Sequence, residues 1–178
     1  MKKIILIKYG ELTTKKSNRN LFIKILSDNI KKSLSGYNFK LNRDRVRMFI
    51  ECEEKDIDNI ILKLKDIFGI YSVVLCYQVN TNIEDIKNGV LEIINNLDFK
   101  TFKVETNRAN KSFSYTSPEF NNIIGGLVLK NKDNIKVDVH NPEYTLRIEI
   151  RDEYTYIYSK EIIASGGYPT GVAGKGIL

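Results

Sequence analysis

The sequence lacks the features of a membrane or secreted protein and has few histidines and cysteines, the usual ligands of zinc. No apolar run approaches the roughly 20 residues that cross a bilayer, and the opening KKIILIKYGEL is too short and too soon acidic for a signal peptide. We therefore expect a cytoplasmic protein with no membrane partner. His140 is the only histidine, and Cys52 and Cys76 occur without a C-x-x-C motif. This predicts buried free thiols and no zinc site.

Motifs for catalysis are missing as well. The sequence shows no paired carboxylates, no catalytic triad and no metal-ligand spacing. Gly174-Lys175 suggests a phosphate-binding loop, but G-x-x-x-x-G-K-[ST] requires glycine where Pro169 stands and serine or threonine where Gly176 stands. We therefore expect no catalytic, cofactor-binding or metal-binding residue in this chain.

Composition and charge favour a globular protein with a basic first half. The 178 residues are 42% hydrophobic and 28% charged, which allows one domain or two small ones. The net charge is +6, with 16 Lys+Arg against 9 Asp+Glu in residues 1–78 and 12 against 13 in residues 79–178. This asymmetry fits either a polyanionic partner or a lysine-rich surface that serves solubility.

The first 79 residues alternate between strand and helix patterns. Residues 2–9 are typical of a buried strand, and Ser17 precedes apolar residues spaced by three and four, which predicts a helix. Two strands joined at residues 42–45 follow, then a helix capped by Asp56 and a strand over residues 70–79. The predicted order is βαββαβ, the ferredoxin-like pattern.

The second half predicts another α/β unit. A helix capped by Thr81 or Asn82 leads to a strand from Lys100, and a helix over residues 118–131 leads to three short strands. Gly125-Gly126 inside that helix costs about 1 kcal/mol per residue relative to alanine. A close backbone contact explains this cost, unless the glycines are simply tolerated.

Residues 100–127 combine basic side chains with a helix start. Strand alternation turns Lys103 toward solvent or a partner, and Arg108 and Lys111 follow in a polar loop. Ser117, followed by proline and glutamate, predicts a capped helix N-terminus. Because helix N-termini leave backbone N–H groups unpaired, this arrangement predicts phosphate binding.

Four segments, in order, resemble the N-terminal portion of the tRNA 4-thiouridine synthetase family, also called tRNA sulfurtransferases. They are IKYGELTTKKSNRNLF, KTFKVETNRANKSFSYTSPEF, KVDVHNPEYTLRIEIR and SGGYPTGVAGKGIL. The resemblance implies an α+β chain with a ferredoxin-like domain over residues 1–79 and a THUMP α/β domain over residues 80–164. Residues 165–178 are then a glycine-rich linker toward a pyrophosphatase-loop catalytic domain that this chain lacks.

The resemblance also implies a function. THUMP domains of this family engage the acceptor stem and CCA end of tRNA. The complete enzyme activates uridine 8 with ATP and magnesium and inserts sulfur from a persulfide, with a cysteine desulfurase as donor. It forms homodimers, and some relatives also serve thiamine biosynthesis. We expect this chain to bind tRNA without being an enzyme by itself.

The RNA-binding residues implied by the resemblance fall on the middle motif and on the His-Asn-Pro turn. They are Lys103, Arg108, Lys111, Ser112 and Asn141. Asn107 departs from the family pattern, in which a basic residue is usual there.

Other candidates remain open on the residues alone. Strand alternation aims Arg43, Arg45 and Arg47 to one side of a hairpin, either as a solvated face or as a further RNA contact. Phe113 and Tyr115 are either core residues or platforms on which unpaired bases stack. The glycine-rich end is a linker or a loop. The alternative function is a stand-alone THUMP adaptor, or the RNA-binding half of a methyltransferase or deaminase.

Overall fold

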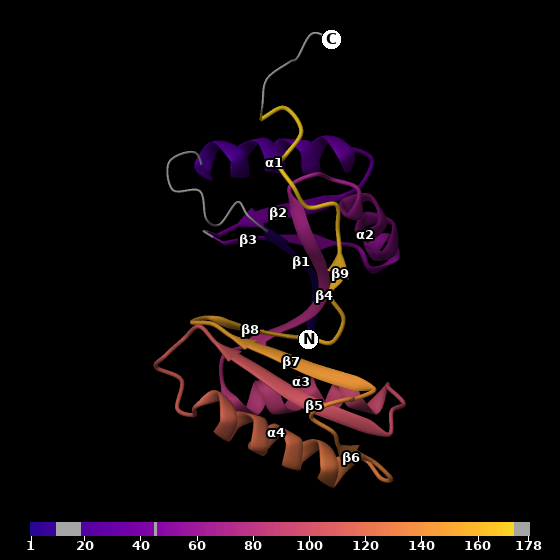
Figure 1. Cartoon of the computed structure of the whole chain (residues 1–178), viewed down its shortest axis with the longest axis vertical. Coiled ribbons are helices and arrows are strands. Elements are labelled where there is room, and N and C mark those ends of the chain that lie inside the picture. The colour runs from indigo at the N-terminus through magenta and orange to yellow at the C-terminus, as the bar shows by residue number, and fades with distance from the viewer. Residues whose placement is uncertain (10–18, 45, 173–178) are drawn as a thin grey trace. The chain divides into compact units, whose positions relative to one another are not determined.

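The computed structural model describes residues 1–9, 19–44 and 46–172, which fold as two compact units (Figure 1). One unit contains Lys3–Leu75 together with residues 161–172, and the other contains Met1–Lys2 together with Cys76–Lys160. We call them the first and the second unit. Ser17 and Arg45, and the tail from residue 173, lie outside the described residues.

The first unit has the predicted βαββαβ order. Its elements are β1 (Lys2–Tyr9), α1 (Arg19–Ser33), β2 (Phe39–Arg43), β3 (Arg47–Cys52), the 3₁₀ turn η2 (Glu54–Asp56), α2 (Ile57–Lys65) and β4 (Ile70–Asn80). The strands lie in the order β2-β3-β1-β4, which is the ferredoxin-like arrangement. The predicted fold class is thereby confirmed for this unit. The residues of β2 lie two positions later than the pattern predicted.

Residue spacing explains how this sheet is covered. Phe22, Leu26 and Ile30 recur every four residues on α1, and they pack in one core cluster with Ile7 and Met48 of the strands. The α2 helix adds its own apolar stripe to the same cluster. Both helices therefore cover one face of the sheet.

The glycine-rich segment returns to the first unit as a docked loop. Strand β9 (Ile162–Ile163) pairs with β4, and the Ser165 N–H donates to the Lys65 carbonyl at 2.9 Å. Pro169 then packs against Gly69, whose φ of +98° favours glycine; an added Cβ would lie 2.7 Å from the proline Cγ. Residues 165–172 therefore form a loop that packs on the first unit. Of the two alternatives for the glycine-rich end, a linker or a loop, these residues form a loop.

The second unit begins within β4, at Cys76, and contains the elements that follow it up to Lys160. Its elements after β4 are α3 (Ile83–Asn95), β5 (Thr101–Arg108), α4 (Ser117–Asn131), β6 (Lys136–Val137), β7 (Tyr144–Ile150) and β8 (Tyr154–Tyr158). Its strands lie in the order β4-β8-β7-β5-β6, with β5 parallel to both β6 and β7. Helices α3 and α4 cover one face of this sheet (Figure 1).

Helix caps in the second unit refine the sequence prediction. The Asn82 side chain caps α3 by accepting from the Asp85 N–H, which decides between the two predicted caps. Helix α4 begins one residue earlier than predicted, because Thr116 and Glu119 form a capping box around its first turn. Ser117 is therefore already helical.

The glycine pair of α4 does not make the predicted close contact. A Cβ built on Gly125 or on Gly126 would meet nothing within 4 Å. Both glycines instead line an open groove beside the helix. The expectation of a close backbone contact was wrong, because both glycines face open space.

Membrane and metal features are missing from the described part of the chain. None of its helices is long and apolar enough to span a membrane. Its His, Cys, Asp and Glu side chains form no group of three that could hold a metal ion.

Candidate nucleic-acid interface

The predicted RNA-binding residues of the middle motif lie along β5 and the loop that joins it to α4. Lys103 and Arg108 belong to β5, whereas Lys111 and Ser112 are exposed in the loop of residues 109–116. Asn141 lies in the separate turn between β6 and β7. Four of the five residues therefore lie on β5 or in the loop that follows it, with Lys103 near the start of the strand and Lys111 beyond its end.

Lys103 is held by an acidic neighbour on its own strand. Its Nζ lies 2.5 Å from Oε1 of Glu105, and the other carboxylate oxygen of Glu105 lies 3.1 Å from Nε of Arg147 on β7. The hydrogen bond from Lys103, together with the nearby Arg147, lowers the pKa of Glu105. Lys103 thus belongs to a three-residue charge cluster on the face opposite the helices.

Arg108 makes its contacts within the loop. Its Nη1 donates to the carbonyl oxygens of Phe113 and Tyr115, each at 3.1 Å, and lies 3.5 Å from that of Lys111. These bonds join the end of β5 to the last residues before α4. The guanidinium therefore has a structural role that the sequence did not reveal.

Lys111 is the most available cation of the motif. Its side chain is exposed, and it makes no ion pair with the residues that the structure describes. The neighbouring Ser112 N–H donates to Oδ1 of Asn110 at 2.8 Å, which shapes the turn that carries the lysine. A phosphate could approach Lys111 without displacing a protein partner.

The N-terminus of α4 is occupied by its own capping box. Oε2 of Glu119 accepts from the Thr116 N–H at 2.7 Å, and the hydroxyl of Thr116 faces the N–H of Glu119. The bond from the Thr116 backbone is the main cause of a lowered pKa at Glu119. A carboxylate already lies where a phosphate was predicted to bind, so the helix end by itself is a poor anion site.

Phe113 and Tyr115 pack inward. The Phe113 ring meets the buried Phe120 ring edge to face, with centroids 5.1 Å apart, and the Tyr115 ring lies 6.2 Å from that of Phe120. Both rings belong to the core of the second unit. Of the two open alternatives, the structure favours core packing over base stacking.

Asn141 lies in a turn organised by Asp138. Oδ1 of Asp138 accepts from the N–H groups of His140 and Asn141 at 3.0 and 2.9 Å, and these bonds lower the pKa of Asp138. The Asn141 side chain is exposed. The neighbouring His140 is exposed as well.

A groove of about 610 Å³ runs between α4 and the edge of the sheet. The Asn121 side chain closes part of this edge by accepting from the Thr106 N–H at 2.9 Å. Exposed Val137 and Val139 contribute apolar surface. The lining residues are Phe102, Lys103, Val104, Pro118, Asn121, Asn122, Gly125, Gly126, Leu129, Val137 and Val139. Sequence reasoning missed the groove, although the unexplained glycine pair marked its position.

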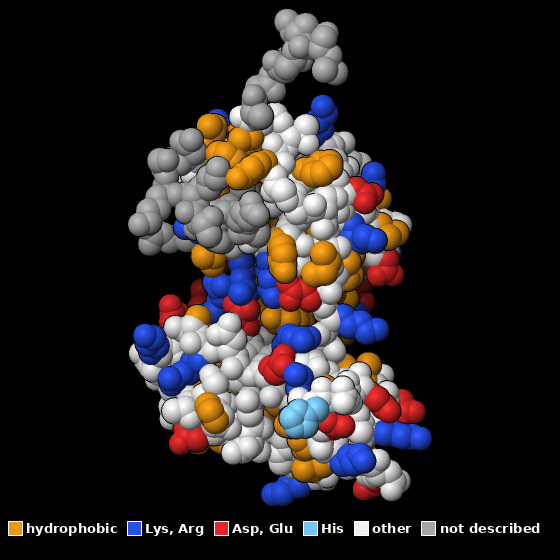
Figure 2. Space-filling model, viewed as in Figure 1, with side chains coloured by type: hydrophobic (Ala, Val, Ile, Leu, Met, Phe, Trp, Pro, Cys, Tyr) orange, Lys and Arg blue, Asp and Glu red, His pale blue; other side chains and the backbone are white. Residues whose placement is uncertain are grey.

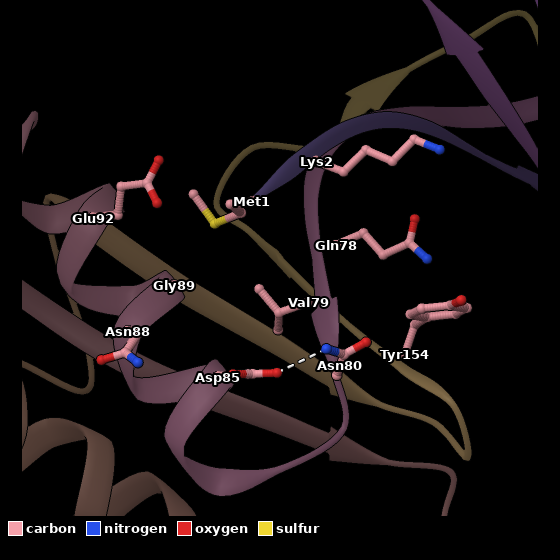
Figure 3. Close-up of a pocket in the computed structure, with 10 residues that line it drawn as sticks. All are labelled: Met1, Lys2, Gln78, Val79, Asn80, Asp85, Asn88, Gly89, Glu92 and Tyr154. Atoms are coloured by element: carbon pink, nitrogen blue, oxygen red, sulfur yellow. Dashed lines mark hydrogen bonds between the residues drawn. The ribbon is translucent and has the colours of Figure 1, made fainter.

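A second concavity of about 460 Å³ lies beside α3 (Figure 3). Asp85 and Glu92 supply carboxylates to it, and Asp85 accepts from Nδ2 of Asn80 at 2.8 Å. Lys2 is the only lysine or arginine among its lining residues. This acidic lining suits a polyanion less well than the groove beside α4.

The hairpin arginines do not share one face. Arg43 pairs with Met48, which is buried in the helix-covered core, whereas Arg47 pairs with Lys8 on β1. Directly paired residues of antiparallel strands point to the same side, so Arg43 and Arg47 lie on opposite faces. The predicted one-sided array was wrong for these two residues.

Charge is divided unevenly between the two units. Residues 76–160 with Met1 and Lys2 carry 12 Lys+Arg and 12 Asp+Glu, so the whole net charge of +6 belongs to the remainder of the chain. On the visible surface, basic and acidic side chains are interspersed (Figure 2). Local placement of cations therefore matters more in the second unit than its net charge.

Family models match both units. The model of the ThiI ferredoxin-like domain matches residues 4–74, and the THUMP domain model matches residues 80–160. A protein of Thermoanaerobacter sp. (strain X514) named "Probable tRNA sulfurtransferase" is 43% identical over 176 residues, which are 98% of this chain and 46% of that relative. The chain therefore contains a ThiI ferredoxin-like domain followed by a THUMP domain, and it is similar to part of this tRNA sulfurtransferase.

Two solved structures are similar to nearly the whole chain. The crystal structure of a 4-thiouridine synthetase–RNA complex with bound ATP is 31% identical, with a TM-score of 0.84 over 100% of this chain and 46% of that one. The crystal structure of PH1313 from Pyrococcus horikoshii is 27% identical, with a TM-score of 0.84 over 97% of this chain and 58% of that one. The chain spans about half the length of the tRNA sulfurtransferase relative that it matches.

Proposed function

We propose that this chain is the tRNA-capturing portion of a sulfurtransferase that makes 4-thiouridine at tRNA position 8, and that it binds the acceptor stem and CCA end. The observation that carries the proposal is the THUMP domain at residues 80–160 in a chain 31% identical to the 4-thiouridine synthetase of an RNA complex. Within that domain, the exposed Lys111 and the groove beside α4 supply a cation and a cleft.

The two features suit the two parts of an acceptor arm. Duplex RNA is recognised through its phosphates and 2′-hydroxyls, whereas unpaired end nucleotides need a cleft that accepts bases. Lys111 lies in the loop before α4, and Pro118 in the first turn of α4 already lines the groove. A strand whose duplex phosphates meet the loop could therefore continue with its unpaired end into the groove.

The sulfur chemistry is assigned to other parts of the complete protein. We infer that ATP, magnesium and a persulfide from a cysteine desulfurase act there, in a homodimeric enzyme. The cysteines of this chain are poor sulfur carriers, because Cys76 is buried and burial raises the pKa of the Cys52 thiol. A raised pKa lowers the thiolate fraction that sulfur transfer requires.

A binding titration tests the proposal. Filter binding of the whole chain to tRNA should weaken steeply with salt, and tRNA without its 3′ tail should bind less tightly than whole tRNA. The variant K103A/R108A/K111A should lose affinity. The control K87A/K100A/K160A removes three exposed or half-exposed cations of the second unit from other places, so the net charge changes equally.

The comparison of the two variants decides the result. Equal loss in both means that only overall charge attracts tRNA, and no loss in the first variant means that the proposed face is wrong. Equal affinity for whole and shortened tRNA would remove the CCA end from the proposal.

A further inference from the structure

Arg108 ends β5, and its guanidinium closes the loop that follows. Nη1 donates to the Phe113 and Tyr115 carbonyls at 3.1 Å each, and the Lys111 carbonyl lies 3.5 Å away. A terminal guanidinium nitrogen carries two hydrogens. Both are therefore used by backbone oxygens of the loop.

The same loop is held from its inner side by aromatic contacts. Phe113 and Tyr115 pack on the buried Phe120 ring of α4, so the residues whose carbonyls bind Arg108 also anchor the loop to the core. Lys111 and Ser112, which precede these anchored residues in the loop, are exposed. The loop thus has a fixed base and an exposed basic tip.

The charge of Arg108 is also partly balanced. Glu119 lies close enough for Arg108 to lower the pKa of its carboxyl group. Three backbone carbonyl dipoles and a nearby carboxylate reduce the attraction of this guanidinium for a phosphate. Lys111 has no such partner among the described residues.

We propose that Arg108 is a positioning residue of the tRNA-binding site: it holds residues 109–116 in the shape that presents Lys111 to the RNA backbone, and it neutralises no phosphate itself. This inference rests on the proposed function for the contact of Lys111 with RNA. The role of Arg108 in ordering the loop exists without RNA. Lysine does not replace it, because its side chain is one atom shorter and its ammonium nitrogen cannot take the place of Nη1 against these carbonyls.

A double-mutant cycle on the whole chain separates positioning from direct contact. Each phosphate contact contributes about 0.9 to the slope of log K against log salt. K111Q should lower the slope by about 0.9, R108Q and R108K should each do the same, and R108Q/K111Q should show no further loss. Additive losses of about 1.8 in the double variant, or parental affinity and slope in R108K, would show that Arg108 binds phosphate and overturn the proposal.

Hydrogen exchange without RNA provides the second readout. The Ser112 and Thr116 N–H groups are hydrogen-bonded within the ordered loop. Their exchange should accelerate about tenfold in R108Q and R108K but not in K111Q, as expected when a net hydrogen-bond contribution of about 1.4 kcal/mol is lost. Circular dichroism and thermal unfolding confirm that each variant is folded.

The exchange and binding experiments test separate parts of the proposal. Unchanged exchange in R108Q overturns the loop-ordering role whatever the binding data show. If K111Q binds tRNA like the parent chain, the proposed binding face is wrong, and so is the proposal that the loop presents Lys111 to RNA. The exchange rates still decide whether Arg108 orders the loop.

Discussion

Glu105 on β5 lies 3.1 Å from Nε of Arg147 on the neighbouring strand β7, while its other oxygen holds Lys103. One carboxylate therefore restrains two cations on the open face of the sheet. E105Q should release Lys103 and remove a repulsive charge, so tRNA affinity at low salt should rise roughly threefold, the scale of one partly exposed ion pair. A titration at low and high salt checks this, since screening should shrink the gain. E92Q on α3 is the matched control, and an equal gain there would mean a net-charge effect only.

Acid should destabilise the second unit through three carboxyl groups. Glu105, Glu119 and Asp138 all have lowered pKa values in the folded state. The unfolded chain binds more protons than the folded one, so their contribution is complete above the ordinary carboxyl pKa of about 4 and is lost as the pH falls through the lower folded values.

Urea unfolding of the parent chain at pH 6 and pH 3 measures this loss. E105Q/E119Q/D138N should show a smaller decrease of the urea midpoint between the two pH values. Some decrease remains, because Glu53 and Asp85 also have lowered pKa values. Identical decreases in the variant and the parent would contradict the assignment.

The start of α4 can be located by two neighbouring substitutions. T116A removes the hydroxyl of the capping box and should lower the free energy of unfolding by about 1 kcal/mol. S117A lies inside the first turn and should change it by less than about 0.5 kcal/mol. Thermal or urea unfolding compares the two variants, and a larger loss in S117A would restore the cap predicted from sequence.

The glycine pair of α4 should behave unlike the buried Gly89 of α3. G125A and G126A should each stabilise the helix by roughly 0.8–1 kcal/mol, because a Cβ at either site meets nothing within 4 Å. G89A should destabilise, since its Cβ would lie 3.0 Å from Cγ1 of Val79 and 3.2 Å from Cδ1 of Ile157. Chemical denaturation measures all three variants. Destabilisation by G125A or G126A would mean that the space above them is not open.

Sequence patterns predicted much of the fold but less of the site. The period of apolar residues on α1 and the strand alternation around Leu146 led to the correct order of elements, because burial selects such patterns directly. Glu149 breaks the alternation rule: it belongs to the polar face but is 2% exposed, with its carboxylate 2.9 Å from Nε of Arg151. An ion pair that buries one partner in this way has no periodic signature.

The sequence by itself determined the resemblance to tRNA sulfurtransferases, the two α/β units and the position of the basic strand and loop, since these depend on local patterns and on segments resembling known relatives. Tertiary structure decided what each cation does: Lys103 meets Glu105, Arg108 ties the loop carbonyls, and Lys111 alone of these three is left available among the described residues. It also placed residues 165–172 on the first unit. The physical reason is that ion pairs, capping and docking depend on distances between groups that the folded chain sets.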